Sequence, residues 1–251
     1  MTPSKICGWH AVQAAIDYLP EQVRQVWLDP QRHDPRCDAL QQRLAALGIP
    51  LHSADKKRLE RLAQSPAHQG VVAEVLLPSM RSEHELHEAL QQAMQHPLWL
   101  VLDHVQDPHN LGACLRTADA AGVRGVILPK DQAVGLTPTV CKVACGAAAT
   151  VPVYQVTNLA RTLRQLKEHG IWVFGADATS AQTLYQTDLT GSVAWVLGAE
   201  GKGLRRLTRE TCDVLVKMPM YGQVSSLNVS VATGVVLYET LRQRAEHCGH
   251  E

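Results

Sequence analysis

The chain has 251 residues, which is long enough for a full hydrophobic core and for two domains. Its 24 lysines and arginines balance 24 aspartates and glutamates, which excludes a global field that attracts nucleic acid, so any RNA contact must come from local clusters. Its seven cysteines form no short paired framework, which argues against a secreted disulfide scaffold and favours a reducing compartment.

The first third of the chain alternates short helical and strand patterns. Helices are predicted over residues 9–19, 36–47 and 55–64, and strands over residues 23–28, 49–52 and 71–76. This alternation indicates a compact α/β domain over residues 1–77, of about the smallest size that folds independently. A basic cluster lies in the third helix, and RNA binding or a solvated helix face explains it equally well; it contains Lys56, Lys57, Arg58 and Arg61.

A polar segment over residues 78–96 follows and predicts a partly helical linker without a strong apolar stripe. Apolar strand patterns then return between helices, at residues 99–105, 126–129, 151–156, 171–176, 193–197 and 214–218. Buried strands between helices predict a parallel sheet that is covered on both faces. We therefore assign a second, larger domain to residues 97–247.

The first of three unusual blocks is DPHNLGACLRTADAAG, over residues 107–122, directly after a predicted strand. The spacing of Leu111 and Leu115 predicts a helix, and the turn residues before it place Asn110 at or near the N-cap. Arg116 falls in the second turn, on a different face from these leucines. Taken alone, Asn110 is explained by capping and Arg116 by ordinary surface exposure.

The second block is VLGAEGKGL, over residues 196–204. Its glycines at 198, 201 and 203 let the backbone turn sharply and approach a ligand closely. Their spacing matches neither the dinucleotide fingerprint nor a P-loop, so a plain glycine-rich turn is the alternative, although such a turn does not require Glu200. A basic cluster follows that would gain from binding an RNA phosphate; it consists of Lys202, Arg205, Arg206 and Arg209.

The third block is SLNVSVATG, over residues 226–234, and it opens an amphipathic segment that reaches about residue 244. Ser225 and Ser226 are natural caps for this helix, whereas Asn228 and Ser230 are poor residues for a helix interior. Two interpretations stay open. Either these polar residues only cap the helix, or Ser226 and Asn228 are held at its start because they face a ligand.

No metal site or membrane segment is predicted. Cys141 and Cys145 are four residues apart and would share a helix face, but no second pair or nearby histidine completes a zinc site. No apolar run approaches the roughly 18 residues of a membrane span, and the first residues do not form a basic segment followed by an apolar stretch. We expect a soluble, cytoplasmic protein.

The three blocks read N-x-G-x-x-x-R-T-A, L-G-x-E-G-x-G and P-M-x-G-x-x-x-S-L-N-V-S-V-A, at residues 110–118, 197–203 and 219–232. In this order they resemble the signature motifs of the SpoU, or TrmH, family of RNA ribose 2′-O-methyltransferases. The shorter segments GWHAV and HQGVVA resemble, less specifically, a ribosomal-protein-like RNA-binding domain of some members. The resemblance implies the SPOUT fold, in which the C-terminal chain forms a deep trefoil knot, and a homodimer formed through this domain.

The same resemblance implies S-adenosylmethionine as the cofactor. It places three residues in direct contact with that cofactor and three more in the loops around it: Gly198, Met218 and Leu227, then Ala176, Leu197 and Gly201. A 2′-hydroxyl that attacks the methyl group must lose its proton, and the developing alkoxide needs a positive or donor group nearby.

We expect Arg116 to stabilise this alkoxide, because a guanidinium stays protonated in proteins. Glu200 would hold Arg116 through a bidentate pair. The remaining catalytic candidates would position Arg116, the ribose or the cofactor: Asn110, Ser226 and Asn228.

The substrate is inferred from the extra N-terminal domain. Family members with this domain include a methyltransferase that acts on a guanosine of 23S rRNA, which is our first choice. A tRNA-modifying enzyme is the alternative within the class, although the terminal extensions typical of those enzymes are not recognised here. A catalytically silent RNA-binding assembly factor is the alternative from another class, and a nicotinamide dehydrogenase is disfavoured by the missing glycine fingerprint.

Overall fold

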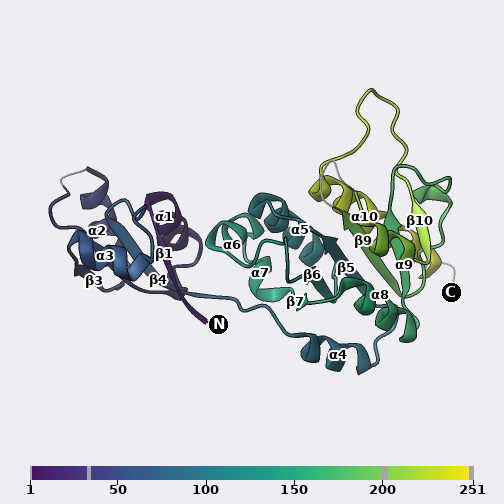
Figure 1. The fold of residues 1–251 in the computed structure, drawn as a ribbon, viewed down its shortest axis with the longest axis horizontal. Coiled ribbons are helices and arrows are strands. Elements are labelled where there is room, and N and C mark those ends of the chain that lie inside the picture. The colour runs from purple at the N-terminus through teal and green to yellow at the C-terminus, as the bar shows by residue number, and fades with distance from the viewer. Residues whose placement is uncertain (1, 33–34, 199–202, 249–251) are drawn as a thin grey trace. The chain divides into compact units, whose positions relative to one another are not determined.

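The computed structural model describes residues 2–32, 35–198 and 203–248. The chain divides into two compact units, Met1–Ser79 with Leu136–Gly146, and Met80–Gly135 with Ala147–Glu251. Each is an α/β unit with its own sheet (Figure 1).

The smaller unit contains a four-stranded sheet in the order β1-β4-β2-β3. Its strands are β1 (Thr2–Cys7), β2 (Val23–Leu28), β3 (Leu51–Ser53) and β4 (Val71–Leu77). β4 pairs antiparallel with both β1 and β2, and β2 pairs parallel with β3. β1 was not predicted, because this edge strand buries a single apolar residue, Ile6, among polar neighbours.

The helices of this unit are α1 (Trp9–Tyr18), η1 (Pro20–Gln22), α2 (Pro35–Ala46), α3 (Lys56–Ala63) and α6 (Pro138–Ala144). Asp55 caps α3 by accepting a hydrogen bond from the Arg58 backbone N–H at 2.8 Å. Leu59 is the buried anchor of α3. The basic side chains of α3 lie on its exposed surface, which is compatible with both interpretations of that cluster.

The cysteines of α6 differ from the prediction. α6 ends at Ala144, and Cys145 takes a left-handed conformation with φ of 51°, so the two thiols do not share a helix face. Cys141 is buried and Cys145 is exposed. Among the described residues no three histidine, cysteine or acidic side chains gather at metal-binding distance.

The larger unit contains a six-stranded sheet in which every pairing is parallel, as the buried strand patterns predicted. The strand order is β10-β8-β9-β5-β6-β7. The strands are β5 (Leu98–Asp103), β6 (Gly125–Pro129), β7 (Val153–Val156), β8 (Trp172–Ala176), β9 (Val193–Gly198) and β10 (Val214–Val216).

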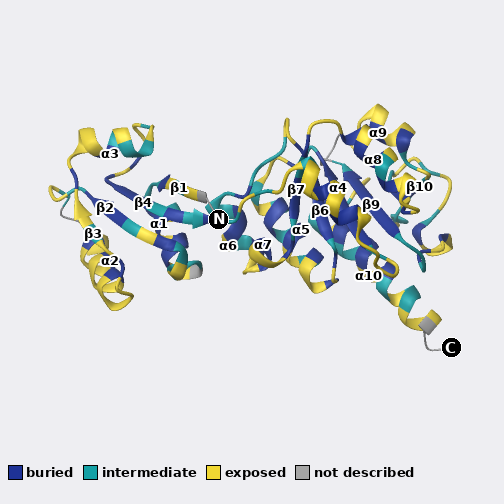
Figure 2. Cartoon of the chain, turned by 90° about the horizontal axis from the view of Figure 1, so that it is seen from below, coloured by how far each residue is buried: buried dark blue, intermediate teal, exposed yellow. Residues whose placement is uncertain are grey.

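Helices cover both faces of this sheet. They are α4 (Glu83–Gln91), α5 (Pro108–Ala120), α7 (Ala147–Thr150), α8 (Leu159–Glu168), η2 (Leu184–Gln186), α9 (Arg206–Thr211) and α10 (Val229–Cys248). Alternate strand residues such as Val101 and Val196 pack on α4 and α8. Trp195 points to the other face and donates a hydrogen bond from Nε1 to Thr240 of α10 at 2.9 Å. Figure 2 shows β6 and β9 almost wholly buried between these layers.

The segment interpreted as a polar linker contains a well-defined helix. Ser82 and Glu85 form a capping box at the start of α4, and Leu86, Ala89 and Leu90 are buried against the sheet. The predicted partly helical character is confirmed, but the helix does have an apolar stripe: these three residues on one face are buried, while most of its other residues are exposed.

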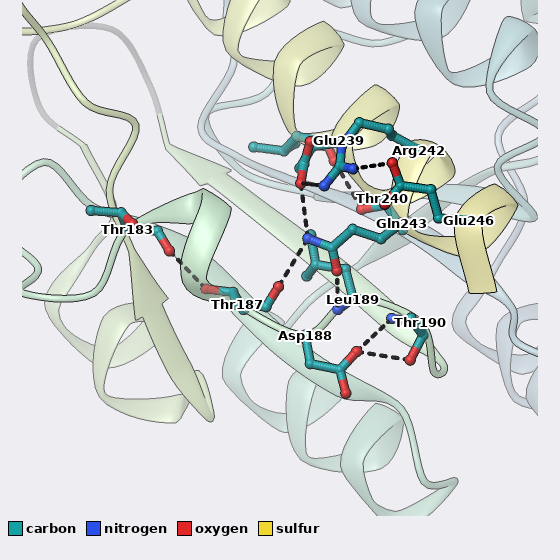
Figure 3. A network of polar contacts seen from close by, with 11 residues as sticks. Thr183, Thr187, Asp188, Leu189, Thr190, Glu239, Thr240, Arg242, Gln243 and Glu246 are labelled. Carbon is teal, nitrogen blue, oxygen red and sulfur yellow. Dashed lines mark hydrogen bonds and ion pairs between the residues drawn. The ribbon is translucent and has the colours of Figure 1, made fainter.

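A polar network holds the second half of α10 against the segment that precedes β9 (Figure 3). The Gln243 carboxamide donates to the Thr187 carbonyl at 3.0 Å and accepts from the Leu189 backbone N–H at 2.9 Å. Glu239 accepts from Gln243 and forms an ion pair with Arg242 at 2.8 Å. Because the end of α10 is fixed beside the start of β9, its beginning lies at the carboxyl edge of the sheet.

Of the helices that the structure describes, none combines the length and the apolar character needed to span a bilayer.

Candidate active site

A cavity of about 450 Å³ opens at the carboxyl edge of the larger sheet, where parallel α/β sheets usually bind ligands. The segments after β8, β9 and β10 and the first turn of α10 supply its walls. The lining residues are Ala176, Asp177, Ala178, Thr179, Leu197, Gly198, Gly203, Leu204, Arg209, Met218, Met220, Ser225, Ser226, Leu227, Val229 and Ala232.

This cavity brings together most residues proposed to contact the cofactor, although they are distant in sequence. Gly198, Met218 and Leu227 line it, with Ala176 and Leu197 beside them. Ser226 lines the same cavity and is exposed to solvent. Gly201, Glu200 and Lys202 lie outside the described residues, so their proposed roles stay predictions.

Gly198 lies very close to the backbone of Gly203 and Leu204 in the second block. A Cβ atom on Gly198 would lie 2.1 Å from both the carbonyl carbon and the carbonyl oxygen of Gly203, and 2.5 Å from the Leu204 nitrogen. Gly203 itself has a φ of 64°, in the left-handed region that glycine adopts without strain. Glycine is therefore required at 198 by the close approach of backbone to backbone, and favoured at 203 by conformation.

Among the described residues, one carboxylate, that of Asp177, faces the cavity. Asp177 accepts hydrogen bonds from the Thr179 backbone N–H at 2.8 Å and from its hydroxyl at 2.6 Å, and Arg209 Nε lies 2.6 Å from its other oxygen. Burial opposes ionisation of Asp177, but these hydrogen bonds and the Arg209 charge outweigh it and lower the pKa of the carboxyl. Asp177 is therefore ionised at neutral pH, and Arg209 is tied to it.

Sequence reasoning missed Asp177. Its position directly after Ala176, at the carboxyl end of a buried strand, was the signal that could have identified it.

Asn110 and Asn228 join the first and third blocks. The Asn228 side-chain nitrogen donates to the Asn110 side-chain oxygen at 3.0 Å, across 118 positions of sequence. The Asn228 oxygen accepts from the Ser230 backbone N–H at 2.9 Å and from the Ser230 hydroxyl at 2.6 Å. Both amide groups are thus held in fixed orientations.

The helix starts differ from the predictions. Asp107 caps α5 by accepting from the His109 backbone N–H at 2.9 Å, and Pro108 is the first helical residue, so Asn110 lies inside the first turn. Ser225 and Ser226 do not start α10; Asn228 stands directly before Val229 and bonds the second helical N–H. The N-cap of α5 is therefore Asp107 and not Asn110, and Ser226 lies before the first residue of α10.

A second cavity of about 280 Å³ adjoins the first and shares Gly203, Leu204 and Val229 with it. Asn110 lies in this second cavity. The other lining residues are His104, Val105, Gln106, Asp107, Gln132 and Arg205.

Arg116 is exposed on α5 and is not among the residues that line either cavity. Its proposed partner Glu200 lies outside the described residues. The Arg116–Glu200 pair therefore remains a prediction.

The described arginines of the second basic cluster differ in their surroundings. Arg205 pairs with Asp103 at 2.8 Å and Arg209 with Asp177 at 2.6 Å, both at the sheet edge. Arg206 has an 89 % exposed side chain, with its nearest carboxylate, on Glu210, at 3.7 Å. Arg206 is thus the arginine of this group that extends furthest into solvent.

Comparison with known proteins agrees with this geometry. Residues 97–238 match the SpoU rRNA Methylase family, and residues 5–80 match the domain described as RNA 2′-O ribose methyltransferase substrate binding. The first match covers more than half of the chain, and this protein belongs to the SpoU rRNA methylase family.

Within that family it is similar to the 23S rRNA (guanosine-2′-O-)-methyltransferase RlmB of Pseudomonas aeruginosa, with 55 % identity over 96 % of each chain. A crystal structure of an RNA 2′-O ribose methyltransferase has a TM-score of 0.64 and 28 % identity, and the match covers 97 % of this chain and 89 % of that one. The SpoU methyltransferase AviRb of Streptomyces viridochromogenes, solved in complex with AdoMet, shares the fold with a TM-score of 0.66 at 24 % identity, over 97 % and 91 % of the chains.

Proposed function

We propose that this protein transfers a methyl group from S-adenosylmethionine to the ribose 2′-hydroxyl of a guanosine in 23S rRNA. The observation that carries the proposal is the cavity at the carboxyl edge, where segments from the second and third blocks meet beside the Asn110–Asn228 pair. The identity with RlmB over 96 % of both chains supports the choice of substrate.

The residues of the larger cavity fit such a cofactor. Apolar side chains of Leu197, Met218 and Leu227 suit a flat purine, and the Ser226 hydroxyl and nearby backbone groups suit the polar parts. The sequence of the loops around this cavity contains no P-loop motif, which agrees with a ligand that carries no phosphate. When bound, S-adenosylmethionine supplies an electrophilic methyl group.

The target ribose is assigned to the smaller cavity. It contains Asn110 and shares a wall with the cofactor cavity, so a ribose hydroxyl bound there would lie next to the methyl donor. Asn110 and Asn228 orient the reacting groups, because each amide is fixed by a partner. By the family resemblance, Arg116 stabilises the alkoxide that forms as the hydroxyl attacks, and Glu200 holds Arg116 in place. Arg116 lines neither described cavity, so in this role its side chain reaches the ribose from outside the smaller cavity.

The remaining expectations from the family resemblance are part of the same proposal. The C-terminal chain forms a trefoil knot, which is supported by β10 lying beyond β8 while α10 returns to pack against β9 and α5. The smaller unit binds RNA, supported by its match to a substrate-binding domain. The active protein is a cytoplasmic homodimer that needs no metal.

Methylation of isolated RNA tests the proposal. The protein is incubated with labelled S-adenosylmethionine and separated 23S rRNA, 16S rRNA and tRNA, and the modified position is mapped by its resistance to alkaline cleavage. We expect label in a single guanosine of 23S rRNA. Label only in tRNA would contradict the substrate, and RNA binding without label would indicate the silent assembly factor.

Arg206 is expected to contact an RNA phosphate. Replacing Arg206 with alanine should weaken RNA binding and reduce the slope of log K against log salt by just under one, because one counterion fewer is released. kcat should change little. Filter binding at several salt concentrations measures this slope for the wild type and for Arg206→Ala. Arg164→Ala is the control, because Arg164 is an exposed residue of α8 that lines neither cavity. Equal slopes for Arg206→Ala and wild type would exclude the contact.

A further inference from the structure

Of the carboxylates that the structure describes beside the candidate site, Asp103 is the most deeply buried, and no step of the proposed reaction uses it. It ends β5, in the middle of the parallel sheet, and its side chain has no exposed surface. A buried carboxylate is unfavourable unless hydrogen bonds or opposite charges compensate it. Its partners therefore show what it is retained for.

Both oxygens of Asp103 bind the same residue, Arg205. One accepts from the Arg205 Nε at 2.8 Å and the other from the Arg205 backbone N–H at 3.1 Å. His104 Nδ1 lies 3.5 Å from the first of these oxygens. The carboxylate thus grips both the main chain and the side chain of a residue 102 positions away.

The gripped segment separates the two cavities. Gly203 and Leu204, directly before Arg205, line both the larger and the smaller cavity. At its other end this segment meets Gly198, where backbone approaches backbone too closely to admit a Cβ atom. The wall between the cavities is therefore fixed at one end by a glycine contact and at the other by Asp103.

We propose that Asp103 is a positioning residue for methyl transfer, which acts through Arg205 by holding the Gly203–Leu204 wall between the cofactor and the target ribose. The inference rests on the proposed function, because it assumes that the two cavities take these two reactants. It also reassigns Arg205, which the sequence placed among the RNA-binding residues, to the framework of the site. A displacement of about 1 Å between reacting groups can cost 10²-fold in rate.

Two variants test the interaction by which Asp103 holds Arg205, called the clamp below. Asp103→Asn keeps the shape but loses the charge, and Arg205→Gln acts from the more exposed side of the pair, where the arginine side chain is 45 % exposed. Each should lower kcat by about 10- to 100-fold with the KM for RNA changed less than threefold. The double variant should be no worse than either single variant, because one interaction is lost in all three. Arg205→Lys should restore part of kcat.

Lys167→Ala is the matched control. It breaks the 2.8 Å ion pair between Lys167 and Asp213 in the same unit, and it lines neither cavity. Its kcat should equal that of the wild type. If Asp103→Asn does not fold, Arg205→Gln and Arg205→Lys decide the question.

Two outcomes would overturn the clamp. An Arg205→Gln variant with unchanged kcat and a raised KM for RNA would make Arg205 a phosphate contact, and additive effects in the double variant would show that the two residues act separately.

Amide hydrogen exchange of the peptide that contains Gly203 and Leu204 gives a readout that needs no activity. It should accelerate in both single variants and not in Lys167→Ala, and unchanged exchange would contradict the clamp. If the wild type methylates no RNA, the proposed function fails, whereas this exchange still reports on the clamp alone.

Discussion

Replacing Arg116 with alanine is expected to reduce methyl transfer by at least about 10²- to 10³-fold, the usual cost of removing one group that stabilises charge in a transition state. The developing alkoxide would lose its guanidinium. Dissociation of S-adenosylmethionine should change less than threefold, because Arg116 does not line the described cavity. Single-turnover kinetics with 23S rRNA and calorimetry with the cofactor measure the two quantities separately.

The effect of Arg116→Ala on catalysis must be separated from any effect on stability. The side chain is exposed on α5, and thermal unfolding of the variant separates a loss of catalysis from a loss of stability. Arg116→Lys is the informative second variant, since it keeps the charge but loses the planar fork that pairs with a carboxylate. It should recover only part of the rate. Methylation by Arg116→Ala at the wild-type rate would remove Arg116 from the mechanism.

The parallel sheet of the larger unit was predictable because its strands are buried on both faces. Uninterrupted apolar runs such as the one that becomes β9 have few alternatives once helical patterns separate them. The order of these strands was not predictable in the same way. β10 pairs with β8 and not with β9, which precedes it in the sequence, and no local pattern encodes that choice.

The candidate site shows the same division between local and long-range information. Gly198 stood out as a glycine after a buried strand, but the reason for it, contact with the Gly203 backbone, appears only in three dimensions. The sequence left capping and ligand binding open for Asn110 and Asn228, and the hydrogen bond between their side chains appears only in the structure. Asp103 lies in an apolar run of the sequence that predicts only a buried strand. Its partner Arg205 is 102 positions further along the chain, so no local pattern connects the two residues.

Replacing Gly198 with alanine should weaken cofactor binding and, with it, methylation. The new Cβ atom would lie 2.1 Å from the Gly203 carbonyl group, and backbone atoms cannot yield as a flexible side chain would. The Gly203–Leu204 wall must therefore move, and this wall lines the cofactor cavity. We expect the dissociation constant for S-adenosylmethionine to rise by at least about tenfold, which corresponds to about 1.4 kcal/mol.

Gly191→Ala provides the matched control, because a Cβ atom at Gly191 would meet no heavy atom within 4 Å. It should bind the cofactor as the wild type does. Thermal unfolding of both variants separates a local change from general destabilisation, since crowding in a packed region typically costs about 1–3 kcal/mol. If Gly198→Ala stays folded and binds S-adenosylmethionine with the wild-type affinity, the close contact between Gly198 and Gly203 does not shape the cofactor site.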